Sequence, residues 1–173
     1  AGKRSRMSKT VGKCRDSACV GVIEGDIAGI IDAEKGRQAC EREAVQINTG
    51  GNWHLEAHMR QDALNRINLE DVDVLFIENV GNLVCPTHWA LGEAIKLCVL
   101  STAEGHDKPL KYPQIFAASD AIVLNKIDLI DLVDFERAPF YASVRALNPP
   151  APLFQVACCT VAGMDEWAAW LLR

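Results

Sequence analysis

The sequence predicts an α/β fold in which a mostly parallel sheet is flanked by helices. Three observations support this prediction: short runs of Val, Ile and Leu that barely alternate with polar residues, helical stretches between these runs, and a chain of 173 residues that is 49% hydrophobic. Apolar runs without alternation are typical of strands that are covered on both faces. Since neither a repeat nor a flexible linker divides the chain, we expect one domain over residues 1–173.

Strands and helices are expected to alternate along the chain. The predicted strands are residues 19–23, 72–77, 95–100, 121–124 and 153–156, and the predicted helices are residues 54–68, 112–119, 135–147 and 164–172. The segment 4–18 carries five basic residues and few apolar ones, so it is expected to be loop or a poor helix. Alternation of this kind implies βαβ units, whose sheets bind ligands at the carboxyl ends of their strands.

Composition disfavours several classes of protein. Lys and Arg number 18 against 23 Asp and Glu, a net charge of −5, which disfavours a nucleic-acid binder. No apolar run approaches the roughly 20 residues of a membrane helix, and the basic start AGKRSRMSKT has no apolar stretch behind it, so we expect neither a membrane span nor a signal peptide. Seven cysteines, an odd number without a CxxC pair, indicate a reduced cytoplasmic chain rather than a disulfide framework.

The most specific motif is the tetrad NKID, which directly follows the predicted strand 121–124. A carboxylate can accept hydrogen bonds from both the ring N–H and the exocyclic amine of guanine, and adenine offers no such pair of donors. The amide and the aliphatic lysine stem would hold the ring in place. We therefore predict that Asn125, Lys126 and Asp128 read guanine; the alternative is an ordinary loop.

Two other predicted strands end in acidic residues. In FIENVG, Glu78 leaves a strand and Gly81 follows three residues later, a pattern typical of a Mg²⁺-organising acid and a glycine whose N–H faces a γ-phosphate. Glu in place of the usual Asp favours contact through water. In VIEGD, Asp26 could help to hold Mg²⁺ or orient water. A turn at the strand end is the alternative for each.

The first residues match the end of a phosphate-binding loop, G-x-x-x-x-G-K-[ST]. Gly2 and Lys3 correspond to its last glycine and its lysine. Arg4 stands where the Mg²⁺-binding Ser or Thr belongs, and Ser5 follows. We therefore expect the chain to begin inside this loop, with its first part missing.

These motifs belong to longer stretches that resemble the HypB family, GTPases that assist nickel insertion during maturation of [NiFe]-hydrogenase. The resemblance covers most of the chain, from about Val20 to the C-terminus. The matching stretches are IEGDIAGIIDAEK, AVQINTGGNWHLEAHM, LFIENVGNLVCP, LGEAIKLCVLS, EGHDKPLKYP, LNKIDLIDLVDF and GMDEWAAWL. The distance from Lys3 to Asp26 also equals the family's distance between its phosphate-loop lysine and its EGD acid.

The resemblance implies a P-loop NTPase-like fold of the SIMIBI type and slow hydrolysis of GTP to GDP and phosphate. It implies catalytic roles for residues that neutralise phosphate charge, organise Mg²⁺ and water, sense the γ-phosphate or reach a partner's nucleotide site: Lys3, Asp26, Glu78, Gly81 and Lys111. It implies nucleotide binding by Gly2, Lys3, Ser5, Asn125, Lys126, Asp128 and Ala157. The segment around Ala157, VACCT, departs from the family's Ser-Ala.

The family's metal site uses a Cys-His pair at a helix start and a later Cys in NLVCP. The corresponding residues are Trp53-His54 and Cys85, so one thiolate ligand is replaced by an indole that is only a donor. The resemblance therefore implies a Ni²⁺ or Zn²⁺ site at His54 and Cys85, completed across a dimer or by His58, His88 or water. Ordinary polar histidines on a helix face are the alternative.

The implied partners are a second copy of the chain, through Leu129 and Val133, a hydrogenase precursor and a companion nickel chaperone. A catalytically impaired metal-binding or scaffold member of the same family is an alternative, because Arg4 alters the phosphate loop. A related GTPase that serves another nickel enzyme such as urease is a third possibility. The stretches NVGNLVCP and DKPLKYP favour the hydrogenase branch.

Overall fold

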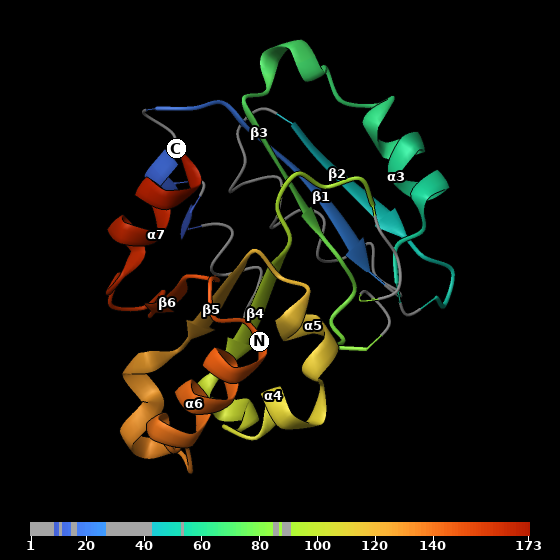
Figure 1. Ribbon diagram of the computed structural model, residues 1–173. Helices are drawn as coiled ribbons and strands as arrows, with labels where there is room; N and C mark the ends of the chain where they lie inside the picture. Colours follow the sequence, from blue (N-terminus) through green and yellow to red (C-terminus); the bar gives the residue numbers. More distant parts are fainter. Residues whose placement is uncertain are drawn as a thin grey trace. The chain divides into compact units, whose positions relative to one another are not determined.

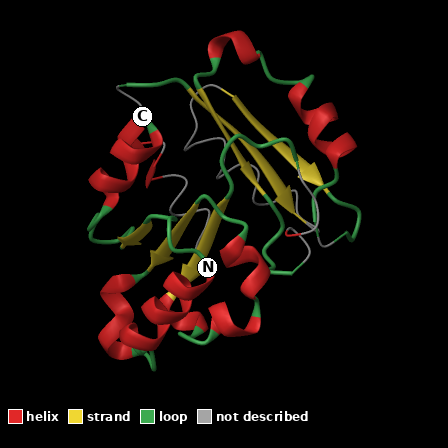
Figure 2. Ribbon diagram, in the orientation of Figure 1, coloured by secondary structure: helices red, strands yellow, loops and turns green. Residues whose placement is uncertain are grey.

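The computed structural model describes residues 9–10, 12–14, 17–26, 43–52, 54–84, 87 and 91–173. These residues form two compact units, Met7–Gly92 and Glu93–Leu171, each built on its own parallel sheet (Figure 1). Figure 2 shows helices beside the strands of both sheets. Parallel strands flanked by helices confirm the predicted α/β class.

The first unit contains a three-stranded sheet in the order β2-β1-β3. Its strands are β1 (Val20–Asp26), β2 (Glu43–Asn48) and β3 (Val74–Glu78), and both neighbouring pairs are parallel. The helix α3 (Ala57–Leu64) and the 3₁₀ turn η1 (Leu69–Asp71) connect β2 to β3. One cluster of buried hydrophobic residues in this unit consists of Ile23, Val45, Ala63 and Ile67.

The second unit contains a three-stranded parallel sheet in the order β4-β5-β6. Its strands are β4 (Leu97–Ser101), β5 (Ala121–Asn125) and β6 (Leu153–Val156). Its helical elements in chain order are η3 (Thr102–Glu104), α4 (Lys108–Lys111), α5 (Pro113–Ala117), η4 (Ile127–Leu132), α6 (Arg137–Leu147) and α7 (Met164–Leu171). All five residues of β5 are buried, as expected for a central strand that is covered on both faces.

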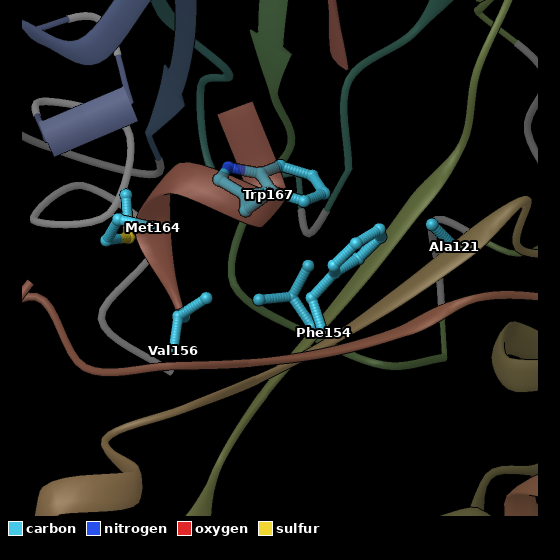
Figure 3. Close-up of a cluster of buried hydrophobic side chains, with 6 residues drawn as sticks. Ala121, Phe154, Val156, Met164 and Trp167 are labelled. Carbon is cyan, nitrogen blue, oxygen red and sulfur yellow. The ribbon is translucent and has the colours of Figure 1, made fainter. Parts of the chain in front are cut away.

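The helix α7 covers one face of this second sheet. Its Trp167 is 1% exposed and lies edge-on to Phe154 of β6, with ring centroids 5.3 Å apart. Figure 3 shows Trp167 and Met164 over Phe154 and Val156, with Ala121 of β5 beside them. Aromatic and aliphatic burial of this kind is the main stabilising term of such a core.

Helices α5 and α6 are joined by a buried amide. Asn148, which follows α6, donates from Nδ2 to the carbonyl oxygens of Phe116 and Ser119 at 2.9 and 2.7 Å. These bonds satisfy carbonyl groups at the end of α5 that have no partner within the helix. They also hold the segment that leads directly into β5.

All five predicted strands are confirmed, with shifts of up to three residues at their ends. The strand β2, with sequence EAVQIN, was not predicted, because its three apolar residues are interrupted by polar ones and give only a weak pattern. Its position is decided by pairing with β1, where Ile23 lies opposite Val45. A weakly patterned strand becomes recognisable only through such a partner.

The predicted helices are confirmed in type, with two corrections. The helix expected over residues 54–68 is α3, which begins at Ala57, because Leu55 turns into the core instead, and which ends at Leu64. The helix expected at 112–119 is α5, and Tyr112 separates it from α4 with a non-helical φ of −131°. Within the segment expected to be loop or a poor helix, residues 9–10 and 12–14 are helical.

The described residues contain neither a membrane-spanning helix nor a disulfide. None of their helices is both long and apolar enough to span a bilayer. No disulfide joins the described cysteines, which are Cys14, Cys19, Cys98, Cys158 and Cys159. Burial raises the pKa of the Cys14 thiol, because it disfavours the thiolate.

Candidate functional site

The predicted guanine-reading residues lie at the carboxyl end of β5. Asn125 is the last residue of the strand and is 1% exposed. Lys126 has a left-handed conformation, with φ 60° and ψ 40°, which non-glycine residues adopt rarely. Its N–H donates to Oδ1 of Asn125 at 2.8 Å, and its carbonyl accepts from Oγ1 of Thr102 at 2.8 Å. These two bonds hold the sharp turn in place.

Asp128 occupies the first turn of η4, two residues after the left-handed turn. Asp128 is exposed, whereas Lys126 is half-buried and Asn125 is buried. The segment therefore presents a carboxylate to solvent beside an amide that the fold holds rigidly. This arrangement suits recognition of a ring that offers two adjacent N–H donors.

The turn after β6 reaches the same strand end. Val156, the last residue of β6, is the register partner of Asn125, and Cys158 follows two residues later. The Cys158 thiol lies 3.6 Å from Oδ1 of Asn125. Ala157, predicted to bind nucleotide, is fully buried, and its N–H donates to the carbonyl of Ala162 at 3.0 Å. Its amide therefore closes the turn, and its role toward nucleotide stays a prediction.

In the first unit, Asp26 and Glu78 end two neighbouring parallel strands. Glu24 of β1 is the register partner of Glu78, so Asp26 lies two residues further along the same direction. This offset amounts to about 6.5 Å of strand length. One carboxylate oxygen of Glu78 is buried. The carboxylate of Glu78 is the kind of oxygen donor that Mg²⁺ prefers, and this ion also retains several waters.

Asn79 connects the end of β3 to the segment before α3, a role that the sequence did not reveal. Its Oδ1 accepts hydrogen bonds from the N–H of Leu55 at 2.9 Å and from that of Val80 at 2.8 Å. Leu55 is fully buried against Gly25, where an added Cβ would lie 2.8 Å from the leucine side chain. His54, which precedes Leu55, is therefore tied to the ends of both acidic strands. The sequence feature that could have indicated this role is an Asn directly after the acidic residue that ends a strand.

His54 lies in this connected segment, at 17% side-chain exposure, with Nε2 3.9 Å from Glu56. His58 is 66% exposed and lies 3.3 Å from the same carboxylate. Among the residues that the structure describes, no three His, Cys, Asp or Glu side chains cluster in a way that could hold a metal ion. Cys85, His88 and Trp53 are outside the described residues, so the predicted pair of His54 and Cys85 stays a prediction.

The remaining predicted catalytic residues are separate from one another along the chain. Gly2, Lys3 and Ser5 are outside the described residues. Gly81 is exposed in the bend after β3. Lys111 ends α4, and its Nζ lies 2.5 Å from the Asp107 carboxylate.

That ion pair on α4 is exposed to solvent. The hydrogen bond to Asp107 raises the pKa of Lys111, and the same bond lowers the pKa of the Asp107 carboxyl. Lys111 therefore stays cationic and remains accessible to another molecule. The predicted dimer residues Leu129 and Val133 are half-buried in and after η4, and Leu132 between them is 80% exposed.

Comparison with known proteins gives consistent matches. The sequence profile described as "CobW/HypB/UreG, nucleotide-binding domain" matches residues 1–155. The hydrogenase maturation factor HypB of Escherichia coli K12 is 44% identical over 171 residues; the match covers 99% of this chain, which spans 59% of that relative's length.

Two solved structures are similar over nearly the whole chain. The structure of HypB from Archaeoglobus fulgidus superposes with a TM-score of 0.90 and 34% identity, covering 99% of this chain and 85% of the other. The structure of HypB from Helicobacter pylori in complex with nickel gives a TM-score of 0.89 and 34% identity, covering 97% and 80%.

Proposed function

Because this chain belongs to the HypB branch of the CobW/HypB/UreG nucleotide-binding family, we propose that it binds and hydrolyses GTP and assists nickel insertion into [NiFe]-hydrogenase. The observation that carries this proposal is the strand end at Asn125, Lys126 and Asp128. There a buried amide, a fixed left-handed lysine and an exposed carboxylate follow one another. We further propose that residues 1–173 act as one GTPase domain, which the family match over residues 1–155 supports.

Guanine selection follows from the chemistry of Asp128. Its carboxylate accepts from two N–H donors on guanine, whereas adenine presents only one donor group at its corresponding edge. Asn125 and the stem of Lys126 hold the ring against this carboxylate. Each charge-assisted bond contributes about 1.5–3 kcal/mol, so the pair favours guanine over adenine strongly.

The phosphates would be handled by the acidic strand ends and by the phosphate loop. Asp26 and Glu78 would hold Mg²⁺ through oxygen atoms and water, and Gly81 would offer its N–H to the γ-phosphate. Bound Mg²⁺ neutralises charge on the phosphate oxygens. Lys3 would neutralise further charge, Gly2 and Ser5 would complete the loop, and Lys111 of a second copy would approach the nucleotide. The offset of about 6.5 Å between the two acidic strand ends supports an arrangement with intervening water.

Nucleotide specificity tests this proposal directly. The affinities of the purified protein for GTP and ATP are compared by fluorescence titration in Mg²⁺, and phosphate release is followed with both. We expect GTP to bind at least about 100-fold more tightly, as two charge-assisted hydrogen bonds predict, and to be turned over. Equal affinity for ATP would overturn the proposal. Tight GTP binding without any turnover would identify the non-hydrolysing scaffold instead.

Nickel is proposed as the cargo, held by His54 and Cys85, with Zn²⁺ as the competing ion. Imidazole nitrogen and thiolate sulfur suit both ions. The H. pylori HypB whose structure resembles this chain was crystallised with nickel. In this chain the hydrogen bond from Leu55 to Asn79 fixes the backbone directly after His54, which supports a preorganised ligand at that position.

The variant His54→Ala is expected to lower Ni²⁺ affinity at least about 10-fold, because a nitrogen ligand is removed from a site with few others. Isothermal titration calorimetry with Ni²⁺ measures this effect. The matched control is His58→Ala, since His58 is four residues away and largely exposed. If both variants bind Ni²⁺ like the unmodified protein, His54 is not a ligand.

The proposed partners are a second copy of the chain, a hydrogenase precursor and a companion nickel chaperone, and the proposed location is the cytoplasm. Contacts through Leu129 and Val133 would form the homodimer. The exposure of Leu132 between them supports an apolar contact surface, because the free energy falls when a partner covers a large apolar side chain.

A further inference from the structure

Cys158 is the residue of the turn after β6 that contacts the buried amide of Asn125. Its Sγ donates to Oδ1 of Asn125 at 3.6 Å, and both residues are buried. The contact follows from the sheet register. Val156, the last residue of β6, lies opposite Asn125, so the turn that contains Cys158 begins beside the end of β5.

The turn leaves Cys158 little freedom to move. The N–H of Ala157 donates to the carbonyl of Ala162, and the two residues form an isolated antiparallel bridge. Gly163 closes the turn with φ +70°, and a Cβ there would lie 1.9 Å from the carbonyl oxygen of Gln155. Only glycine permits so close a return of the backbone. The thiol is therefore held at a set position beside the amide.

The thiol and one backbone N–H together determine the orientation of the Asn125 amide. Oδ1 accepts from the N–H of Lys126 at 2.8 Å and from the thiol, and a carbonyl oxygen has two lone pairs. Rotating the amide by 180° would place its NH₂ group against the N–H of Lys126, which can only donate, and would lose the S–H···O bond from Cys158. In the observed orientation, the NH₂ group of Asn125 therefore points away from the Lys126 N–H and the Cys158 thiol and can act as a donor. Purine N7 is a hydrogen-bond acceptor on the imidazole edge of guanine.

We propose that Cys158 is a positioning residue for guanine recognition, which orients the Asn125 amide so that its NH₂ group donates to N7 of the base. The inference rests on the proposed guanine-nucleotide binding and adds a residue to that site. It also gives a role to a cysteine of the segment VACCT, which departs from the family's Ser-Ala, since the thiol supplies a donor to the amide oxygen.

The test compares Cys158→Ala with the unmodified protein, using GDP and 7-deaza-GDP, which lacks the N7 acceptor. Loss of one weak donor is expected to lower GDP affinity about threefold to tenfold. Affinity for 7-deaza-GDP is expected to change by less than about twofold, because the amide's target is already absent. The matched control is Cys159→Ala, which removes the exposed neighbouring thiol and should leave both affinities unchanged. Far-UV circular dichroism confirms that each variant is folded.

A purely structural role of Cys158 predicts equal losses for GDP and 7-deaza-GDP, and that result would overturn the inference. Unchanged GDP affinity in Cys158→Ala would also overturn it. A second cycle uses Asn125→Ala, in which removal of the Cys158 thiol should have no further effect on GDP. If the unmodified protein does not bind GDP more tightly than ADP, the proposed function fails. If it binds GDP more tightly and Cys158→Ala has the same GDP affinity, only the positioning role fails.

Discussion

The variant Asp128→Asn is expected to lower GTP affinity at least about 100-fold, because two charge-assisted hydrogen bonds are lost and a donor NH₂ group faces the donors of guanine. The same variant is expected to gain affinity for XTP. Xanthine carries a carbonyl oxygen where guanine has its exocyclic amine, so the asparagine can donate to this oxygen and accept from the ring N–H. Fluorescence titrations with GTP and XTP measure the switch.

The control for this variant is Asp131→Asn in the same 3₁₀ helix. Asp131 has a side chain that is 90% exposed and pairs only loosely with Arg137, at 3.6 Å. Its replacement changes the same charge at nearly the same place and should leave both affinities within about twofold. Equal losses in the two variants would show that net charge, and not base recognition, governs binding.

The variant Trp167→Ala is expected to destabilise the unit that contains α7 by about 3–5 kcal/mol. Trp167 is almost completely buried, and its removal leaves a cavity beside Phe154 and Trp170, which pack against it. The sheet beneath cannot collapse into this space, since β5 is fixed on both sides by β4 and β6. Urea denaturation followed by far-UV circular dichroism measures the change in the free energy of unfolding.

The matched control is Glu166→Gln, one position earlier on the same helix and exposed. Surface substitutions of this kind change stability by no more than about 0.5 kcal/mol. If Trp167→Ala loses no more stability than this control, then α7 is not an integral part of the core. In that case the cluster in Figure 3 would not anchor the turn that carries Cys158.

Asn79 gives a physical link between two predicted functions of the first unit. It directly follows Glu78, which is proposed to organise Mg²⁺, and it holds the backbone beside His54, which is proposed to bind nickel. The end of β3 is therefore connected to the segment that carries His54 through one hydrogen bond. Gly25 contributes to the same link, because its missing side chain makes room for Leu55.

The sequence by itself determined five of the six strands among the described residues, the class of fold and the position of the NKID tetrad. Buried parallel strands require near-continuous Val, Ile and Leu, a pattern that is visible locally. The tetrad is contiguous and follows such a strand, so its position at the strand end needed no tertiary information. Asp26 and Glu78 were recognisable for the same reason, as acids that follow apolar runs.

Only the tertiary structure decided which distant residues support these motifs. Thr102 bonds to Lys126 across 24 positions, Asn79 to Leu55 across 24 and Cys158 to Asn125 across 33. The strand β2 likewise became evident only beside β1. The pairing of β2 with β1 and the contact of Thr102 with Lys126 depend on register between strands, because a shift of one residue turns a side chain to the opposite face of the sheet. Register is a property of paired strands, and no single segment of the sequence contains it.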